Sequence, residues 1–280
     1  MKRKLEVSEL IFKILSHVFL IAFAICCLYP FLYAISAAIS GIEAVEGGQL
    51  VLLPKDLQFE AFANMFNNNM FWNSYTNTLF ITFYGTLWSM GTSILGAYAL
   101  SKKRLLFRKT FNFFLVFTMW FSAGLVPQYL NYLNTQAVFR TFGITDDKWL
   151  VVIAMGMAAM NIILLRNAFE GVPAEIEEAA IIFGVPWRKR MTRILFPIQK
   201  SSFLSGYLLP MVSCMRELSL FVLLVPTSNT LLTTMLMQYS EKGWAQFGNA
   251  INLLIIVVVL AFVCMIMLVG GFMRLQDAKA

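Results

Sequence analysis

The sequence predicts an all-α integral membrane protein with six transmembrane helices and a cytoplasmic helix–turn–helix between the fourth and the fifth. The first observation is composition: 59% of the 280 residues are hydrophobic and 13% are charged, whereas soluble domains carry about 25% charged residues. The mean hydropathy of +0.71 agrees. The second observation is that the apolar residues gather in segments long enough to cross a bilayer as a helix, which takes about 20 residues. The lipid bilayer is therefore a partner of this chain.

Six apolar segments divide the chain into predicted spans and loops. The predicted spans are residues 11–39, 72–101, 109–130, 148–169, 202–226 and 246–273, within a single transmembrane domain of residues 1–280. The basic start, Met1–Lys4, is typical of a signal peptide, but no A-x-A cleavage site follows before Pro30, and the apolar stretch is too long for one. We expect this first segment to remain in place as a membrane helix.

The basic residues indicate how the spans are oriented. The N-terminal segment, the loops after the second and fourth spans, and the C-terminal tail together hold 17 Lys and Arg residues, whereas the opposite loops hold four. Loops rich in Lys and Arg stay in the cytoplasm, so both termini are predicted to be cytoplasmic. Because the net charge of +7 is spread over these short flanking segments, it predicts no nucleic-acid partner.

Within the spans, two local patterns predict packing and helix ends. Gly85, Ser89, Ser93 and Ala97 recur every four residues, which draws a stripe of small side chains along one face of the second span. Such a stripe lets another helix approach closely. Asp146, which stands just before the fourth span, is expected to cap that helix.

The loop between the fourth and fifth spans, residues 170–200, contains the signals for two short helices. Pro173 suits the first turn of a helix, where its missing N–H has no cost, and the glutamates after it are favourable near a helix N-terminus. Gly184 is expected to end this helix in a left-handed conformation. Pro186 then opens a second, basic helix, which Pro197 is expected to end. The sequence thus predicts an acidic helix followed by a basic helix at the membrane surface.

The residue order in this loop resembles the cytoplasmic coupling loop of bacterial ABC importer permeases. The matching residues are Glu178, Ala179, Ala180, Gly184, Ile194 and Pro197, in the pattern E-A-A-x3-G-x9-I-x-x-P. In that family the coupling helix docks in a groove of the ATP-binding subunit, so the resemblance implies that these residues contact an ATPase. The alternative is a surface helix whose basic half binds anionic lipid headgroups. The full pattern, in the expected topological position, favours the coupling loop.

Other segments are similar to the carbohydrate importer permeases in particular. They are Leu53-Pro54-Lys55, Ser122–Pro127 and Met160–Phe169. The resemblance implies a permease subunit of the bacterial cell membrane that forms half of the pathway for a sugar or oligosaccharide. It also implies three kinds of protein partner: an ABC ATPase dimer, a second permease subunit, expected to be a different chain, and an extracellular solute-binding protein.

The fifth predicted span departs from the carbohydrate permeases. Those proteins carry a Trp-Asn pair where this chain has Ser213–Leu220, and Arg216-Glu217-Leu218-Ser219 is more similar to importers of ferric iron and related solutes. A charge inside a membrane usually faces a bundle interior or an aqueous path. Arg216 and Glu217 are thus candidates for a pathway or gating role, with a structural bridge between helices as the equal alternative. A secondary transporter is less favoured, because no inverted repeat is evident.

The sequence lacks the motifs for ATP binding and catalysis, so we expect a partner to hydrolyse ATP. No G-x4-G-K-[ST] loop occurs to hold ATP phosphates. With one histidine, and four cysteines in apolar runs, no catalytic or metal constellation is expected. We therefore predict that the chain is not an enzyme, carries no cofactor or metal, and takes energy from a separate ATPase that binds the nucleotide.

Overall fold

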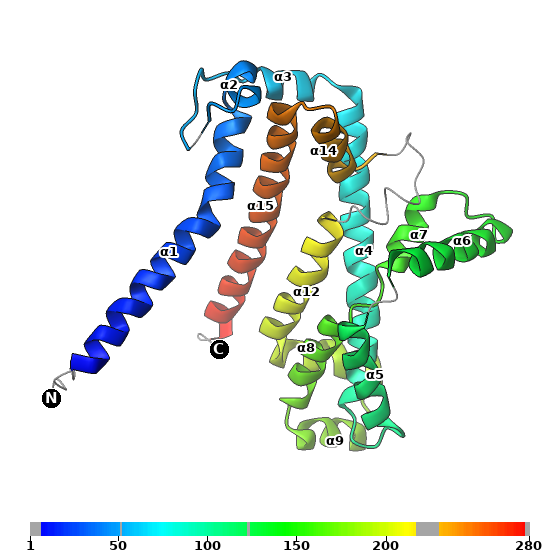
Figure 1. Cartoon of the computed structure of the whole chain (residues 1–280). Coiled ribbons are helices and arrows are strands. Elements are labelled where there is room, and N and C mark those ends of the chain that lie inside the picture. The colour runs from blue at the N-terminus through cyan, green and yellow to red at the C-terminus, as the bar shows by residue number, and fades with distance from the viewer. Residues whose placement is uncertain (1–6, 51, 122–123, 217–229, 278–280) are drawn as a thin grey trace. The chain divides into compact units, whose positions relative to one another are not determined.

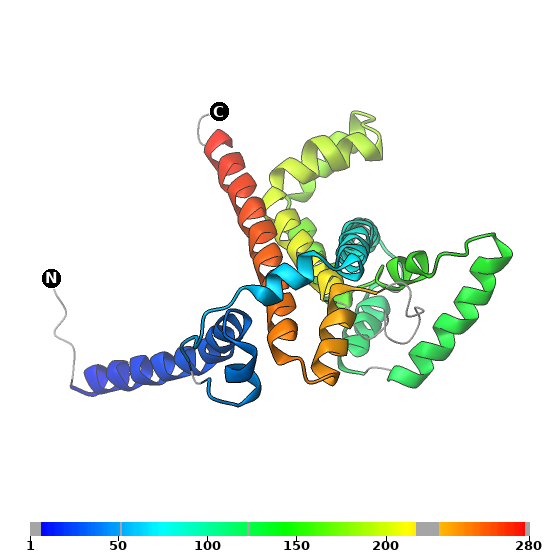
Figure 2. The same cartoon turned by 90° about the horizontal axis from the view of Figure 1, so that it is seen from above.

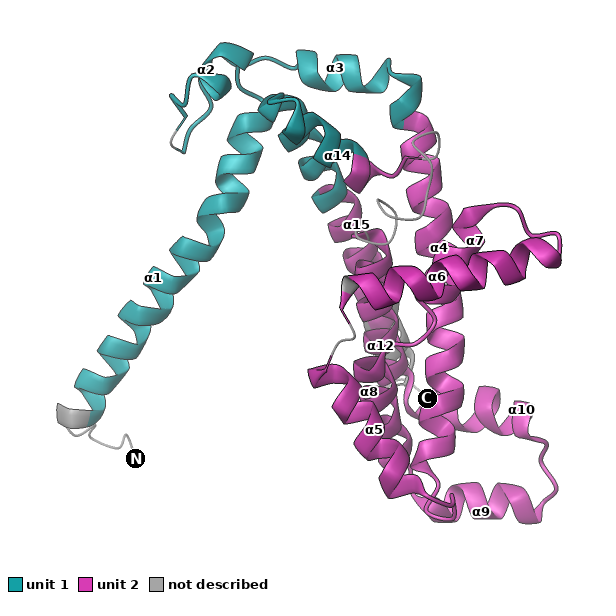
Figure 3. Cartoon of the chain, turned by 45° about the vertical axis from the view of Figure 1, so that its right-hand side comes forward, with its two compact units in different colours: residues 1–71, 235–256 teal, residues 72–234, 257–280 magenta. Residues whose placement is uncertain are grey.

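The computed structural model describes residues 7–50, 52–121, 124–216 and 230–277, and this part of the chain contains helices and no strand. The contacts divide the chain into two compact units (Figure 3). Unit 1 comprises residues 1–71 and 235–256, and unit 2 comprises residues 72–234 and 257–280. Unit 2 contains the predicted coupling loop.

Unit 1 joins the N-terminal helix to a segment near the C-terminus. Its helices are α1 (Val7–Ala38), α2 (Ile42–Glu46), α3 (Glu60–Phe66), most of α14 (Leu232–Glu241) and the first part of α15 (Ala245–Asp277). Ala37, Ala44 and Val45 form a small apolar core. The amide of Gln246 donates a 2.6 Å hydrogen bond to the carbonyl of Ser40. These contacts fix the end of α1 against the start of α15, while residues 9–31 of α1 leave large apolar side chains exposed.

Unit 2 contains the remaining helices (Figures 1 and 2). They are α4 (Asn69–Ser101), α5 (Arg108–Trp120), α6 (Leu125–Thr141), α7 (Asp147–Ala154), α8 (Ala159–Glu170), α9 (Ala174–Ile182), α10 (Trp187–Arg190), the π-helix η1 (Met191–Leu195), α11 (Phe196–Ile198) and α12 (Lys200–Met215). Helix α7 begins as predicted, because the side chain of Asp146 accepts a 3.0 Å hydrogen bond from the backbone N–H of Lys148.

The core of unit 2 forms where α4, α8 and α12 meet. Ala97 from α4, Ile162 and Leu165 from α8, and Phe203 from α12 are all buried in one apolar cluster. The predicted stripe of small residues is confirmed as a packing surface, because Gly85, Ser89, Ser93 and Ala97 are all buried. At Gly206 of α12 an added Cβ would lie 3.0 Å from Leu165. Small residues on two helices therefore set how closely the three can approach.

Some of the six predicted spans are helices that are long and apolar enough to cross a membrane. Glu9–Ala38 and Ala245–Leu268 are each long and apolar enough to cross a membrane, with mean hydropathies of 2.4 and 3.2. The fourth predicted span is a pair of helices, α7 and α8, bent by 49° at a short break, and the two meet the same criterion together. The described residues thus give two or three candidate spans, and the count of six stays a prediction.

The other three predicted spans differ in informative ways. Helix α4 covers the second, but its buried face carries Ser74, Thr78, Thr82 and Thr86, which lowers its hydropathy. The third, predicted over residues 109–130, is divided: α5 ends at Trp120 and α6 starts at Leu125. The residue before α6 is Gly124, whose φ of +86° suits only glycine well. The described part of the fifth ends with α12 at Met215, and residues 217–229 lie outside the description.

The close approach of α4 to α12 yields a prediction about stability. An added Cβ at Gly85 would lie 3.0 Å from Sγ of Cys214, whereas at Gly91 of the same helix nothing lies within 4 Å. Gly85→Leu is expected to lower the free energy of unfolding by roughly 1–3 kcal/mol through overpacking, measured by thermal unfolding of the purified protein. Gly91→Leu is the control and should cause no loss. Equal stability of the two variants would contradict the packing described.

Candidate functional site

The first helix of the predicted coupling loop ends as the sequence predicts. Gly184 has a φ of +67°. Its N–H donates to the carbonyl of Ile181 at 2.9 Å, and the N–H of Val185 donates to the carbonyl of Ala180 at 2.9 Å. This pair of bonds is a Schellman motif, in which a left-handed glycine satisfies the last carbonyls of a helix. The start of this helix lies within one residue of the prediction: Pro173 was expected in the first turn and is the N-cap residue before α9.

The surface of α9 is exposed and largely apolar. Ile181, Ile182 and Phe183 are 54%, 83% and 84% exposed. Of the predicted contact residues on this helix, Glu178 and Ala179 are exposed beside them, whereas Ala180 is only 6% exposed. Ala180 therefore packs inward, and the exposed surface extends toward Phe183 instead. Sequence reasoning missed Ile182 and Phe183, although two large apolar residues just before a helix-ending glycine were a usable signal.

The second helix of the loop runs further than predicted. It starts after Pro186 as expected, but it continues past Pro197 through α11 to Ile198, and the chain turns at Gln199. The helix accommodates the proline by widening into the π-helix Met191–Leu195. Proline lacks an N–H and its ring crowds the carbonyl four residues earlier. For Pro197 that carbonyl belongs to Arg193, within the π-helical turn. Of the two predicted contact residues here, Ile194 is half-buried and Pro197 is exposed.

One carboxylate fastens this loop to the end of α4. Oε1 of Glu177 on α9 accepts a 2.6 Å hydrogen bond from the hydroxyl of Tyr98, and Oε2 forms an ion pair with Nζ of Lys102. The guanidinium of Arg190, on α10, lies 3.8 Å from Oε1. We call these four residues the Glu177 cluster. The sequence identified Glu177 only as a negative charge near a helix start. Tyr98, in the last turn of α4, and Lys102, the residue directly after α4, are four residues apart, and both reach Glu177.

The environment of Glu177 keeps its carboxylate charged. Burial alone would raise the pKa of Glu177, but hydrogen bonds from Lys102 and Tyr98, and the charges of Lys102 and Arg190, outweigh burial and lower it. A lowered pKa means that the cluster stabilises the fold above the ordinary glutamate pKa of about 4.3. That contribution is lost as the pH falls from there through the lowered value.

A second set of polar contacts joins α5 to α8. The guanidinium of Arg108 pairs with Glu170 and also donates to the carbonyl of Leu100 at 2.8 Å. Arg166 lies 3.5 Å from Glu170 and donates to Asn112 at 2.6 Å. The basic residues that the sequence used for orientation therefore also hold this end of unit 2 together.

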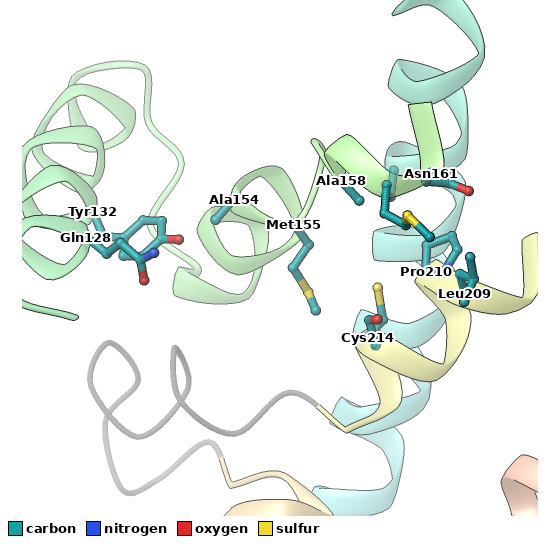
Figure 4. A pocket seen from close by; sticks show the side chains of 12 residues that line it. Gln128, Tyr132, Ala154, Met155, Ala158, Asn161, Leu209, Pro210 and Cys214 are labelled. Carbon is teal, nitrogen blue, oxygen red and sulfur yellow. The ribbon is translucent and has the colours of Figure 1, made fainter. Parts of the chain in front are cut away.

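Further along α8, a cavity of about 590 Å³ lies beside the break between α7 and α8 (Figure 4). Its lining comes from five helices and the break: Ser89, Gln128, Tyr132, Ala154, Met155, Ala158, Met160, Asn161, Leu209, Pro210, Ser213 and Cys214. Figure 4 shows Met155 and Cys214 between Gln128 and Tyr132 on one side and Leu209 and Pro210 on the other. The cavity lies within unit 2 alone.

Side chains of α4 donate hydrogen bonds to backbone carbonyls at this break. The indole N–H of Trp88 donates to the carbonyl of Ile153 at 3.3 Å, and the hydroxyl of Thr92 donates to the carbonyl of Gly156. An added Cβ at Gly156 would lie 2.3 Å from the indole nitrogen of Trp88. Glycine at this position is therefore what lets α4 support the broken helix.

Two polar side chains of the cavity wall have unsatisfied hydrogen-bonding groups. Asn161 and Ser89 are each 1% exposed. The amide of Asn161 and the hydroxyl of Ser89 have no hydrogen-bond partner among the described residues. A buried polar group without a partner is costly, which makes Asn161 and Ser89 the candidate polar contacts of the cavity wall.

The predicted pathway pair is only partly described. Arg216 is exposed at the end of α12, where its N–H donates to the carbonyl of Val212 at 3.2 Å. It directly follows the cavity-lining segment that ends with Cys214, but it does not itself line the cavity. Glu217 lies outside the described residues. A pathway or gating role for the pair stays a prediction.

Comparison with known proteins identifies the family of this fold. The model of the family described as "binding-protein-dependent transport system inner membrane component" matches residues 70–280. The chain belongs to this family. The resemblance inferred from the coupling-loop pattern is therefore confirmed, and the chain is a component of an inner-membrane transport system.

Named relatives of this inner membrane component transport carbohydrates and related solutes. The polygalacturonan/rhamnogalacturonan transport system permease protein YtcP of Bacillus subtilis (strain 168) is 33% identical over 174 residues, 62% of this chain and 58% of YtcP. The chain thus matches less than two thirds of YtcP. The sn-glycerol-3-phosphate transport system permease protein UgpE of Shigella flexneri serotype 5b (strain 8401) is 24% identical over 271 residues, 93% of this chain and 94% of UgpE.

A solved structure is similar over nearly the whole chain. It is the crystal structure of a bacterial ABC transporter involved in the import of the acidic polysaccharide alginate, with a TM-score of 0.77 and 32% identity. The match covers 95% of this chain and 99% of the matched chain. The similarity places the helical fold of this chain among those of ABC importers.

The left-handed glycine of the coupling loop yields a second prediction. Gly184→Val is expected to weaken the end of α9, because a side chain in this conformation costs roughly 1–2 kcal/mol, and β-branching adds to that. Hydrogen exchange at the amide of Val185 should accelerate about five- to thirtyfold. Gly184→Asn is the control, since asparagine tolerates the left-handed region, and its effect should be smaller. Equal exchange rates in the two variants would contradict a conformational role for Gly184.

Proposed function

We propose that this chain is a permease subunit of an ATP-driven ABC importer and forms half of the pathway for a sugar or oligosaccharide. The observation that carries the proposal is the exposed apolar surface of α9, on a loop held to α4 by the Glu177 cluster. Anionic lipid headgroups attract basic side chains, whereas the exposed surface of α9 carries Glu175 and Glu178 beside Ile182 and Phe183, on a loop so held. An apolar patch that is rigidly presented fits docking into a groove of a protein partner.

The partner on this surface is an ABC ATPase dimer. Glu178, Ala179 and Gly184 lie on or beside the apolar patch and meet the groove of the ATPase, while Ile194 and Pro197 belong to the second helix, which supports α9. The chain has no phosphate-binding loop of its own. Closure of the ATPases would favour one conformation of the permease over another, and the free energy for transport comes from that difference.

The solute would contact this chain in the cavity beside the break of α7 and α8. The unpaired amide of Asn161 and hydroxyl of Ser89 suit the hydroxyl groups of a sugar. YtcP is named for polygalacturonan and rhamnogalacturonan, and the solved importer takes up alginate. All three polysaccharides contain uronic acids, and oligosaccharides of uronic acids are therefore the solutes we propose first. Ferric iron or another small solute, suggested by Arg216 and Glu217, is the less favoured alternative, because YtcP and the solved importer both take polysaccharides.

The remaining parts of the assembly follow from the family. A second permease subunit, expected to be a different chain, would complete the pathway, and an extracellular solute-binding protein would deliver the solute to the outer loops. We propose six spans with both termini in the cytoplasm, as the distribution of basic residues indicates.

The docking surface generates a third prediction. Phe183→Asp places a charge in the centre of the apolar patch and removes a side chain whose burial is worth about 1.5–3 kcal/mol. The affinity for the ATPase subunit should fall at least about tenfold, measured by co-purification and by titration of the ATPase onto the detergent-solubilised permease. Thr192→Asp adds the same charge at an exposed position of the second helix, outside the patch, and should bind nearly as the natural chain does.

Two results would contradict different parts of this proposal. If the natural chain retains no ATPase subunit, the proposal is wrong. If Phe183→Asp binds the ATPase as tightly as the natural chain, α9 is not the docking surface.

The cavity generates a fourth prediction, which separates a functional side chain from a structural one. Asn161→Leu removes two buried polar groups that lack partners and keeps a similar volume, so the midpoint of thermal unfolding should stay the same or rise. Uptake of labelled trigalacturonate should nevertheless fall severalfold. Asn77→Leu is the matched control: Asn77 donates a 3.0 Å hydrogen bond to the carbonyl of Thr230, so its loss should lower stability. Undiminished uptake by Asn161→Leu would exclude Asn161 from the pathway.

A further inference from the structure

The Glu177 cluster ties the coupling loop to a helix that the loop does not adjoin in sequence. Tyr98 and Lys102 stand at the cytoplasmic end of α4, 79 and 75 positions from Glu177. Both donate to the carboxylate of Glu177, and Arg190 approaches it from α10. Three helices therefore meet at one acidic side chain.

The carboxylate of the cluster is more enclosed than those of surface ion pairs, and the side chain of Lys102 is 35% exposed. The side chains of Glu177 and Arg190 are 15% and 16% exposed. The ammonium group of Lys102 lies 4.2 Å from the centre of the Tyr98 ring, and the ring of Trp187 packs on the same tyrosine at 6.0 Å between centroids. Exposed ion pairs contribute little, whereas charge-assisted hydrogen bonds that are shielded from water are among the stronger ones.

Two adjacent glutamates of α9 have opposite environments. Glu178 is exposed and makes no ion pair within the described part of the chain, whereas Glu177 is largely buried in the cluster. Adjacent residues on a helix point about 100° apart. The carboxylate of Glu178 is thus directed to the surface, where a partner can bind, and that of Glu177 to the body of the permease.

The cluster completes a second connection from α9 to the cavity. The first is covalent, because α8 leads into α9 through residues 171–173, and Asn161 of α8 lines the cavity. Another part of the lining is Ser89 of α4. Helix α4 reaches α9 through Glu177, so the two walls are attached to the loop by different means.

We propose that Glu177 is a positioning residue that links α9 to α4, so that both of these cavity walls follow a displacement of the coupling loop. The inference rests on the proposed function, because the displacement is ascribed to the docked ATPase. The link fixes the geometry through which ATP hydrolysis drives solute movement. The solute and the nucleotide do not touch Glu177.

The test uses the transporter assembled with its ATPase, second permease and binding protein in proteoliposomes, with labelled trigalacturonate as solute. Glu177→Gln keeps the shape and one acceptor oxygen but removes the charge that holds Lys102 and Arg190. We expect the trigalacturonate transported per ATP hydrolysed to fall about tenfold, while the ATPase still co-purifies and hydrolyses ATP. Glu175→Gln, at an exposed position of the same helix, should match the natural chain.

A double variant shows whether the two sides of the link act together. Lys102→Met removes the cation from α4 and should also lower transport per ATP. Residues that act through one connection are not additive, so Glu177→Gln combined with Lys102→Met should be no worse than the lower single variant. A purely structural role would lower thermal stability and leave the ratio of transport to hydrolysis unchanged.

Several outcomes would overturn the link. Natural transport per ATP in Glu177→Gln excludes it, and loss of ATPase binding in that variant assigns Glu177 to docking instead. If Glu177→Gln does not fold, Tyr98→Phe decides, because it removes one hydrogen bond and should lower the ratio two- to fivefold; an unchanged ratio there also excludes the link. By contrast, a natural chain that binds no ATPase contradicts the proposed function itself.

Discussion

The close packing of α4 against α8 and α12 is the constraint on which the rest of unit 2 depends. It requires small residues where the helices approach: Gly85 faces Cys214, and Gly206 faces Leu165. Because these positions lack bulk, α4 can reach the break between α7 and α8 with Trp88 and Thr92. The same helix reaches the coupling loop with Tyr98 and Lys102. One helix therefore supports both the cavity and the exposed apolar surface of α9.

The features predicted correctly from sequence are those that depend on local chemistry. Gly184 ends its helix in a left-handed conformation and Asp146 caps α7, because each needs only the backbone within a few residues. The stripe from Gly85 to Ala97 was also visible, since its spacing alone places it on one face. The coupling-loop pattern then led to the family that the comparison confirms.

What the sequence did not predict depends on contacts between distant residues. Nothing near Glu177 in sequence indicates that Tyr98 and Lys102 surround it. Hydropathy likewise read residues 109–130 and 148–169 as continuous spans, because it averages over a window and does not register backbone breaks. Gly124 and Gly156 stand at those breaks. Gly124 is required by its backbone, whose φ is +86°, and Gly156 by its close contact with Trp88, and neither feature is visible in the sequence.

The short connection between α8 and α9 has a mechanical consequence. Residues 171–173 join them directly, with the N–H of Gly171 bonded to the carbonyls of Asn167 and Ala168 at 3.1 and 3.2 Å, and Val172 is buried. The connection has little slack, so a displacement of α9 would be passed on to α8, which would turn about the break at residues 155–158. Twelve residues of helix are about 18 Å long. A push of about 3 Å at the coupling loop would then turn α8 by roughly 10°, and the segment nearest the pivot, which bears Asn161, would rotate more than it translates.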